Sequence, residues 1–204
     1  HTAAGAGGAV SSIDGSAATG KLSITTTNVT ADDKSGVGLT VKGGSANDTI
    51  TLAQKATVDA GAGDDTITTA LAGGTLTGGA GNDKFDVASS IAAVGALTEA
   101  AGAFKTTITD IAAGDSIKLL AGNTAFTSTK IVLDGTVTNL DQALAQATIT
   151  PASNAVTWFQ YGTSTYVVAN EGTGGFGAGD IVIKLTGLVD LSNSTLDTTT
   201  DYLT

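Results

Sequence analysis

Residues 43–51 read GGSANDTIT, and the same pattern returns at 60–68 as AGAGDDTIT and at 78–86 as GGAGNDKFD. Each copy begins with small residues, has an aspartate at its sixth position and has a large apolar residue at its eighth. The aspartates Asp48, Asp65 and Asp83 are 17 and 18 residues apart. A repeat of this length holds two turns and two short strands. We therefore expect an all-β structure in which the copies stack as successive parallel coils.

The apolar residues of this region fit two rows inside such a stack. One row takes the eighth residue of each copy, and the facing row takes the residue nine positions earlier. The expected rows are Ile50, Ile67 and Phe85, and, opposite them, Val41, Val58 and Leu76. Their neighbours along the chain are mostly threonines, which suit strand positions that face solvent.

The turns of the three copies predict a calcium site. Glycine permits a tight turn with positive φ, and aspartate supplies a hard anionic oxygen. Two turns stacked one coil apart offer about six carboxylate and carbonyl oxygens, which suits Ca²⁺. We expect two ions, one between the turns of Asp48 and Asp65 and one between those of Asp65 and Asp83. The candidate ligand residues are Gly43, Gly44, Ser45, Ala46, Asp48, Ala60, Gly61, Ala62, Gly63, Asp65, Gly78, Gly79, Ala80, Gly81 and Asp83.

The three copies resemble the calcium-binding nonapeptide G-G-x-G-x-D-x-U-x of RTX proteins. Residues 106–119 (TTITDIAAGDSIKL) resemble the segment that follows these repeats in serralysin-type proteases, with Ile111 where phenylalanine is usual. Residues 158–162, 165–168 and 180–187 resemble the C-terminal part of RTX proteins exported by type I secretion, bacterial surface-layer proteins among them. The resemblance covers roughly residues 38–192.

This resemblance implies a right-handed parallel β-roll followed by a C-terminal β-rich cap or sandwich-like region. It also implies calcium as the cofactor, the type I secretion machinery as a partner and an uncleaved C-terminal signal, with which residues 191–204 are compatible. The expected function is that of a structural constituent of a bacterial surface layer, located outside the cell and self-associating into a lattice. A cell-surface glycan is a further possible partner through regions outside this sequence. The alternatives are the secretion and folding module of an RTX exoenzyme, such as a serralysin-like protease, or of a toxin or adhesin.

Composition excludes several other classes of protein. The chain of 204 residues has nine lysines, no arginine and a net charge of −10, so we expect it to bind neither nucleic acid nor an anionic membrane surface. It has no cysteine, and its single histidine is His1. No run of apolar residues approaches the roughly 20 needed to span a membrane. The sequence also lacks a G-x-S-x-G, an H-E-x-x-H and a phosphate-binding loop, so we expect no enzyme activity.

The expected organisation has three parts. Residues 1–37 form β-rich coils that begin with His1, which we interpret as the remnant of a purification tag, so the sequence is expected to be a fragment of a longer chain. Residues 38–90 form the β-roll, and residues 91–204 form the capping and secretion-signal region. Two segments favour helix: 90–103, which is rich in alanine, and 139–147, where Thr138 and Asp141 have capping-box spacing. We expect residues 90–119 to cap one end of the roll.

Three further groups of residues have more than one interpretation. The segment 171–180, with Glu171 and Asp180, is either a glycine-rich hairpin loop or a further calcium loop. Asp32 and Asp33 belong either to a solvated turn or to a ligand set. The aromatic residues either form the core of the C-terminal sheet, which we expect, or line a sugar-stacking surface; they are Trp158, Phe159, Tyr161 and Tyr166.

Overall fold

The computed structural model describes residues 10–26, 38–70, 73–89, 106–119, 122–149, 154–170, 176 and 179–204. Strands are the main regular structure of these residues, as expected for an all-β chain, and the described part also contains one helix. Several predictions lie outside the described residues: the helix at 90–103, the ligand roles of Asp32, Asp33 and Glu171, and the interpretation of His1. The divisions after residues 37 and 90 fall at undescribed segments and stay predictions.

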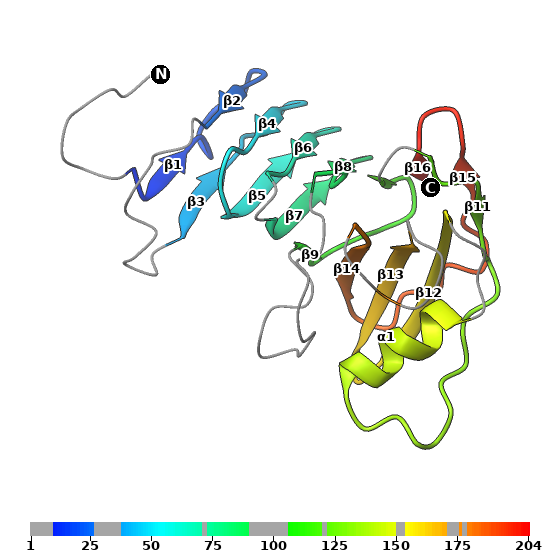
Figure 1. Ribbon diagram of the computed structural model, residues 1–204. Helices are drawn as coiled ribbons and strands as arrows, with labels where there is room; N and C mark the ends of the chain where they lie inside the picture. The colour runs from blue at the N-terminus through cyan, green and yellow to red at the C-terminus, as the bar shows by residue number, and fades with distance from the viewer. Residues whose placement is uncertain are drawn as a thin grey trace.

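Among the described residues, the first sheet has nine strands. In spatial order they are β1 (Ser12–Asp14), β3 (Leu39–Lys42), β5 (Ala56–Ala62), β7 (Gly74–Ala80), β9 (Thr106–Ile108), β14 (Ile181–Thr186), β13 (Ser164–Asn170), β12 (Ala155–Tyr161) and β11 (Ala125–Phe126). Pairing is parallel from β1 to β14 and antiparallel between β14, β13 and β12. Figure 1 shows this sheet running from the N-terminal strands to the C-terminal part of the molecule.

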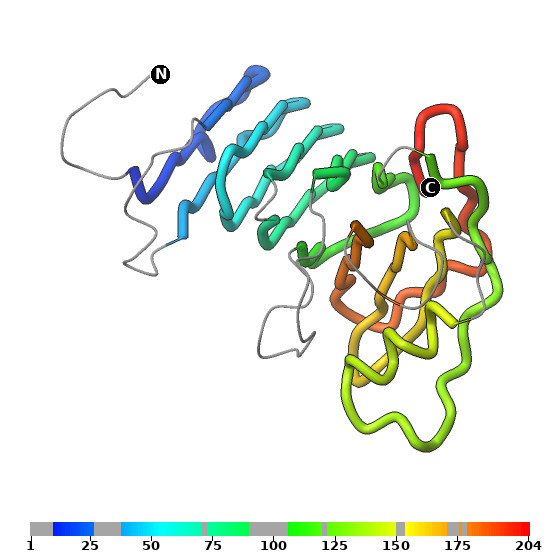
Figure 2. The backbone as a smooth tube through the Cα atoms, in the orientation of Figure 1, coloured from blue at the N-terminus to red at the C-terminus, as the bar shows by residue number. Residues whose placement is uncertain are grey.

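The second sheet of the described residues has seven strands. In spatial order they are β15 (Leu196–Asp197), β16 (Tyr202–Leu203), β10 (Ser116–Lys118), β8 (Lys84–Asp86), β6 (Thr66–Thr68), β4 (Thr49–Thr51) and β2 (Ser23–Thr25). The strands from β2 to β10 pair in parallel. Strands β1 to β10 therefore alternate between the two sheets, and Figure 2 follows the chain as it passes back and forth between them.

The two expected apolar rows are confirmed. Val41 pairs with Val58 and Val58 with Leu76 in the first sheet, while Ile50 pairs with Ile67 and Ile67 with Phe85 in the second. All six side chains are fully buried in one hydrophobic cluster. The alternation of β-branched and polar residues therefore buries one face of each short strand, and stacking makes these faces continuous.

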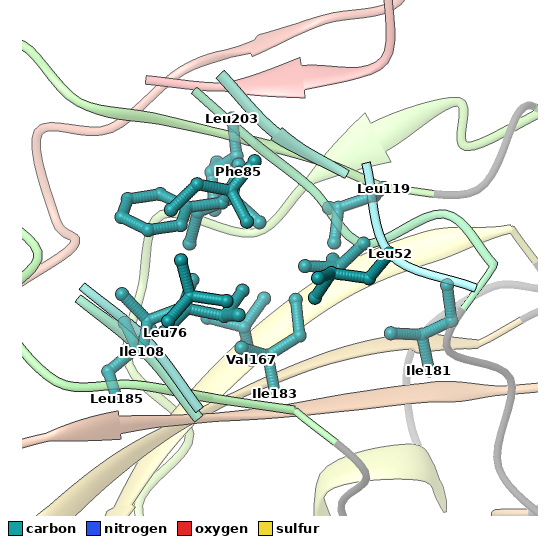
Figure 3. Close-up of a cluster of buried hydrophobic side chains, with 14 of the residues drawn as sticks. Leu52, Leu76, Phe85, Ile108, Leu119, Val167, Ile181, Ile183, Leu185 and Leu203 are labelled. Carbon is teal, nitrogen blue, oxygen red and sulfur yellow. The ribbon is translucent and has the colours of Figure 1, made fainter. Parts of the chain in front are cut away.

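Residues 106–119 continue the stack rather than capping it, which corrects the expectation for the described part of 90–119. Strand β9 pairs with β7 and β14, and β10 pairs with β8 and β16. Ile108 and Ile117 extend the two apolar rows because they have the same alternation as the preceding strands. Figure 3 shows Leu76, Ile108 and Leu185 together, across the core from Phe85 and Leu203.

The C-terminal part combines the expected hairpin with a helix. Strands β12 and β13 form the hairpin, and α1 (Leu140–Ile149) packs Ala143, Leu144 and Ala147 against their other face. Phe159 and Tyr166 stack there with ring centroids 5.2 Å apart. No helix in the described part of the chain is long and apolar enough to cross a membrane.

The helix predicted over 139–147 is confirmed, but its cap differs by one residue. The Gln142 amide donates to Asn139 Oδ1 (2.9 Å), and Gln142 Oε1 accepts from the Thr138 amide (2.7 Å). Asn139 and Gln142 therefore take the capping positions predicted for Thr138 and Asp141, because an amide side chain satisfies the free N–H groups of the first turn.

Candidate metal centre

The sixth-position aspartates of the three copies lie directly above one another. Each backbone amide donates to the carboxylate one coil further along: Asp48 N to Asp65 Oδ1 (2.6 Å), Asp65 N to Asp83 Oδ1 (2.9 Å) and Asp83 N to Asp115 Oδ1 (2.8 Å). We call these four residues the aspartate ladder. Asp48, Asp65 and Asp83 are each 1% exposed. The predicted aspartates are thus brought together, and the strand stacking places their carboxylates in a single buried column.

The two ends of the aspartate ladder have all their carboxylate oxygens occupied. Asp48 Oδ1 accepts from the Leu22 amide (2.7 Å) and its Oδ2 accepts from the Gly44 amide (2.7 Å). Asp115 Oδ2 accepts from the Ala112 amide (2.8 Å). Leu22 immediately precedes β2, just as Asp48 immediately precedes β4 in the next coil. The coil of β2 therefore has a leucine at the ladder position, and the column of carboxylates ends at Asp48.

Asp65 and Asp83, the two middle members of the ladder, each have one carboxylate oxygen that no donor contacts in the described part of the chain. Asp65 Oδ2 and Asp83 Oδ2 are buried and make no hydrogen bond among the described residues. A buried carboxylate oxygen without a donor is costly, because desolvation is not repaid by any contact. These two oxygens are therefore the atoms of the ladder that are available to a cation.

Burial and mutual repulsion shift the titration of both residues. Desolvation raises the pKa of Asp65 to about 6, with smaller contributions from the charges of Asp83, Asp48 and Asp64. Desolvation also raises the pKa of Asp83, and the nearby carboxylates of Asp115 and Asp110 add to the effect. A cation bound to these carboxylates would reduce their mutual repulsion and offset the cost of their burial by stabilising the ionised form, so the electrostatics favour binding of positive charge.

The glycines of the turns permit a close approach between successive coils. Gly79 and Gly81 have φ angles of 103° and 137°, which disfavour residues with a Cβ atom. A Cβ at Gly79 would also clash with the Gly61 carbonyl oxygen, and one at Gly81 with the Gly63 carbonyl oxygen. The backbone of the third turn therefore lies directly against carbonyl oxygens of the second turn, a close approach that only glycine permits.

The first copy departs from this geometry. Gly61 and Gly63 of the second copy have positive φ, whereas Gly44 and Ala46 of the first do not. Ser45 is exposed, and Gly43 and Gly44 are buried, with Gly43 lying close to the Ala60 carbonyl and to Asp48 Oδ2. The first turn therefore differs in backbone conformation from the turns that precede Asp65 and Asp83.

Sequence reasoning missed two carboxylates of this region. Asp115 completes the ladder, and Asp110 accepts from the amides of Gly78 (3.0 Å) and Gly79 (2.8 Å). The signal for Asp115 was present, because Asp115-Ser116-Ile117 has the same aspartate-to-apolar spacing as the three copies. Asp110 has no counterpart in the copies, and its role depends on the fold.

The donor set of the candidate centre contains only hard oxygens. In the described ranges, no three or more Asp, Glu, His or Cys side chains converge on one point in a way that could hold a metal. Two spare carboxylate oxygens combined with turn carbonyls fit Ca²⁺, which accepts carbonyl ligands readily, better than they fit a transition metal. The ligand roles of the individual turn residues, among them Ala62 and Ala80, stay predictions.

The remaining candidate residues are placed as follows. Trp158, Phe159 and Tyr166 are buried and Tyr161 is partly buried, so the aromatic residues form the core, as expected. Asp180 is 2% exposed at the start of β14. No protein-family model and no curated protein matches this chain, so its resemblance to RTX proteins stays a prediction.

Proposed function

We propose that this chain is a calcium-dependent folding module, built as a right-handed parallel β-roll with a C-terminal β-rich region. The observation that carries the proposal is the pair of buried carboxylate oxygens, Asp65 Oδ2 and Asp83 Oδ2, without a donor among the described residues. Calcium would be held by these two oxygens and by carbonyls of the adjacent turns, and its charge would offset the repulsion within the column.

Calcium binding and folding would be one process in such a module. Without the ion, the aspartate ladder places unpaired negative charges in a buried column, and ordering many glycines costs further conformational entropy. With the ion, its binding free energy adds directly to the stability of the folded chain. The module would stay unfolded at low calcium concentration and fold at the millimolar concentrations for which extracellular modules are tuned.

The proposed biological setting is the bacterial cell surface. We place the chain in a surface-layer protein of the RTX type, secreted by a type I system, in which calcium drives folding and assembly. The support is the three-copy pattern together with a high content of threonine, alanine and glycine and the lack of cysteine. Two bound calcium ions would change the net charge from −10 to about −6 and so weaken repulsion between copies.

A calcium titration of the whole chain tests the proposal. We expect calorimetry to count at least two Ca²⁺ ions, and circular dichroism to show a cooperative gain of strand structure over the same concentration range. Magnesium should be a poor substitute because it requires a tighter octahedron. A chain that is fully folded in chelator and does not bind calcium at millimolar concentration would refute the proposal.

Assembly requires a separate measurement on the longer parent protein. Sedimentation in calcium, in magnesium and in chelator should show self-association in calcium alone. A parent protein that is folded but monomeric in calcium would favour the secreted-enzyme or toxin alternative over the surface-layer role.

A further inference from the structure

A shallow cavity of about 650 Å³, widely open to solvent, lies at the edge of the C-terminal sheet, away from the aspartate ladder. Its volume lies within the range of small-molecule sites in proteins. Three separate segments line it: residues 128–130, Trp158 and Gln160 of β12, and the loop with Asp190 and Ser192. Nothing in the calcium proposal uses these residues.

A local arch of the chain creates the cavity. The Thr127 amide donates to the Val156 carbonyl (2.8 Å), and the Ile131 amide donates to the Trp158 carbonyl (3.0 Å). Three residues thus lie between Thr127 and Ile131, whereas only one residue lies between their partners on β12. Ser128, Thr129 and Lys130 must arch away from the sheet edge, as the extra residues of a bulge do, and all three line the cavity.

The polar groups of the cavity are held in place by hydrogen bonds. Trp158 Nε1 donates to the Ser128 carbonyl (3.0 Å), which connects the floor of the cavity to the arch. Gln160 accepts from Lys130 Nζ (2.9 Å) and donates to the Val189 carbonyl (3.1 Å), which connects the arch to the opposite loop. A cavity whose walls are already cross-connected loses little entropy when it binds a ligand.

The lining presents both charges and several hydroxyls. Lys130 and Asp190 lie close enough for the lysine charge to contribute to the lowered pKa of Asp190, whose main causes are hydrogen bonds from Ser192. Ser128, Thr129 and Ser192 add groups that both donate and accept. Asp190 and the net charge of −10 would repel a free anion, and the ammonium group of Lys130 would repel a free cation at this site.

We propose that this cavity binds a neutral, hydroxyl-rich ligand, a saccharide unit. Sugar hydroxyls donate and accept hydrogen bonds at the same time, which matches a lining that mixes an ammonium, a carboxylate and hydroxyls. Trp158 is only 2% exposed, so recognition rests on hydrogen bonds and not on stacking of the indole against a sugar face. The inference does not depend on calcium binding by the aspartate ladder.

The chain carries its own reporter for this site, because Trp158 is its only tryptophan. Glucose, galactose and N-acetylglucosamine are titrated in turn into the folded chain in calcium, with inorganic phosphate as the anionic comparison. We expect at least one sugar to shift the Trp158 emission with saturation in the millimolar range, and phosphate to have no effect. Saturation-transfer NMR should detect contact with the same sugar.

Matched variants locate the binding. Lys130→Gln and Asp190→Asn should each weaken sugar binding about tenfold, because each removes a hydrogen bond to a charged group. Lys55→Gln and Asp197→Asn make the same charge changes at exposed positions that do not line the cavity and should leave affinity unchanged. Circular dichroism confirms that each variant is folded. The proposal is overturned if none of the three sugars gives a saturable shift, if phosphate binds instead, or if the control variants weaken binding as much.

Discussion

Replacing Asp65 with asparagine should have opposite effects on stability with and without calcium. The substitution keeps an oxygen that can accept from the Asp48 amide (2.6 Å) and removes a buried charge whose Oδ2 makes no hydrogen bond among the described residues. Asparagine cannot ionise, so the variant loses the cost of that charge. It also loses an anionic calcium ligand.

The pKa shift gives the magnitude. Burial raises the pKa of Asp65 to about 6 from the ordinary aspartate value of 3.8, a difference that corresponds to about 3 kcal/mol at most. The folded-state pKa is raised, so the destabilisation is complete above pH 6 and disappears as the pH falls below 3.8. The new amide nitrogen is buried without an acceptor, which costs about 1–3 kcal/mol. At pH 7 in chelator, the variant should therefore be as stable as the wild type or up to about 2 kcal/mol more stable. At pH 4 it should be the less stable of the two.

Urea unfolding in calcium measures one effect, and folding titrations with the stabilising osmolyte trimethylamine N-oxide in chelator measure the other, because the chain is expected to be unfolded in chelator alone. Both are followed by circular dichroism at several pH values. In millimolar calcium at pH 7 the order should reverse, with the wild type more stable. Asp59→Asn is the matched control, because Asp59 is exposed on β5 and the substitution makes the same change in charge. If Asp65→Asn destabilised the chain equally in chelator and in calcium at pH 7, the carboxylate would be a structural acceptor only and the reasoning would be wrong.

Three further predictions concern the aspartate ladder and the neighbouring Asp110. Asp83→Asn should reduce calcium affinity, measured by calorimetry, more than Asp48→Asn does, because both oxygens of Asp48 already accept backbone amides. Calcium affinity should fall as the pH is lowered through about 6, because protons then compete for Asp65; an affinity unchanged between pH 7 and pH 5 would contradict this. Asp110→Asn should lower the stability of the calcium-loaded chain by about 1.5–3 kcal/mol in thermal unfolding, since one of its two amide contacts, to Gly78 or Gly79, is lost.

The strand stacking could be predicted because it depends on local periodicity. The alternation around Ile50, Ile67 and Phe85 places one face of each strand inside, and the 17- and 18-residue spacing then sets the register. The helix at 140–149 was predictable for the same reason, since its capping residues lie next to it in sequence. Features that repeat or lie close together along the chain can be read without the structure.

The candidate site could be predicted only in part, because its final form depends on partners distant in sequence. Asp115 lies 32 residues after Asp83, which breaks the spacing of 17 and 18 residues between the three copies. The saturation of Asp48 depends on the Leu22 amide, 26 residues away, and no feature of the three copies encodes that contact. The sequence therefore identified three of the four carboxylates of the ladder and could not show which of their oxygens remain available.

Strand β9 joins two kinds of sheet, and this has a mechanical consequence. On one side it pairs in parallel with β7 of the stacked coils, and on the other with β14, which begins the antiparallel strands. A pulling force on the N-terminal coils therefore reaches the C-terminal strands through backbone hydrogen bonds rather than through a flexible linker. The register of β9 is three residues with each neighbour, so under tension the first sheet should part at this junction before it parts between β3, β5 and β7, which pair over four and six residues.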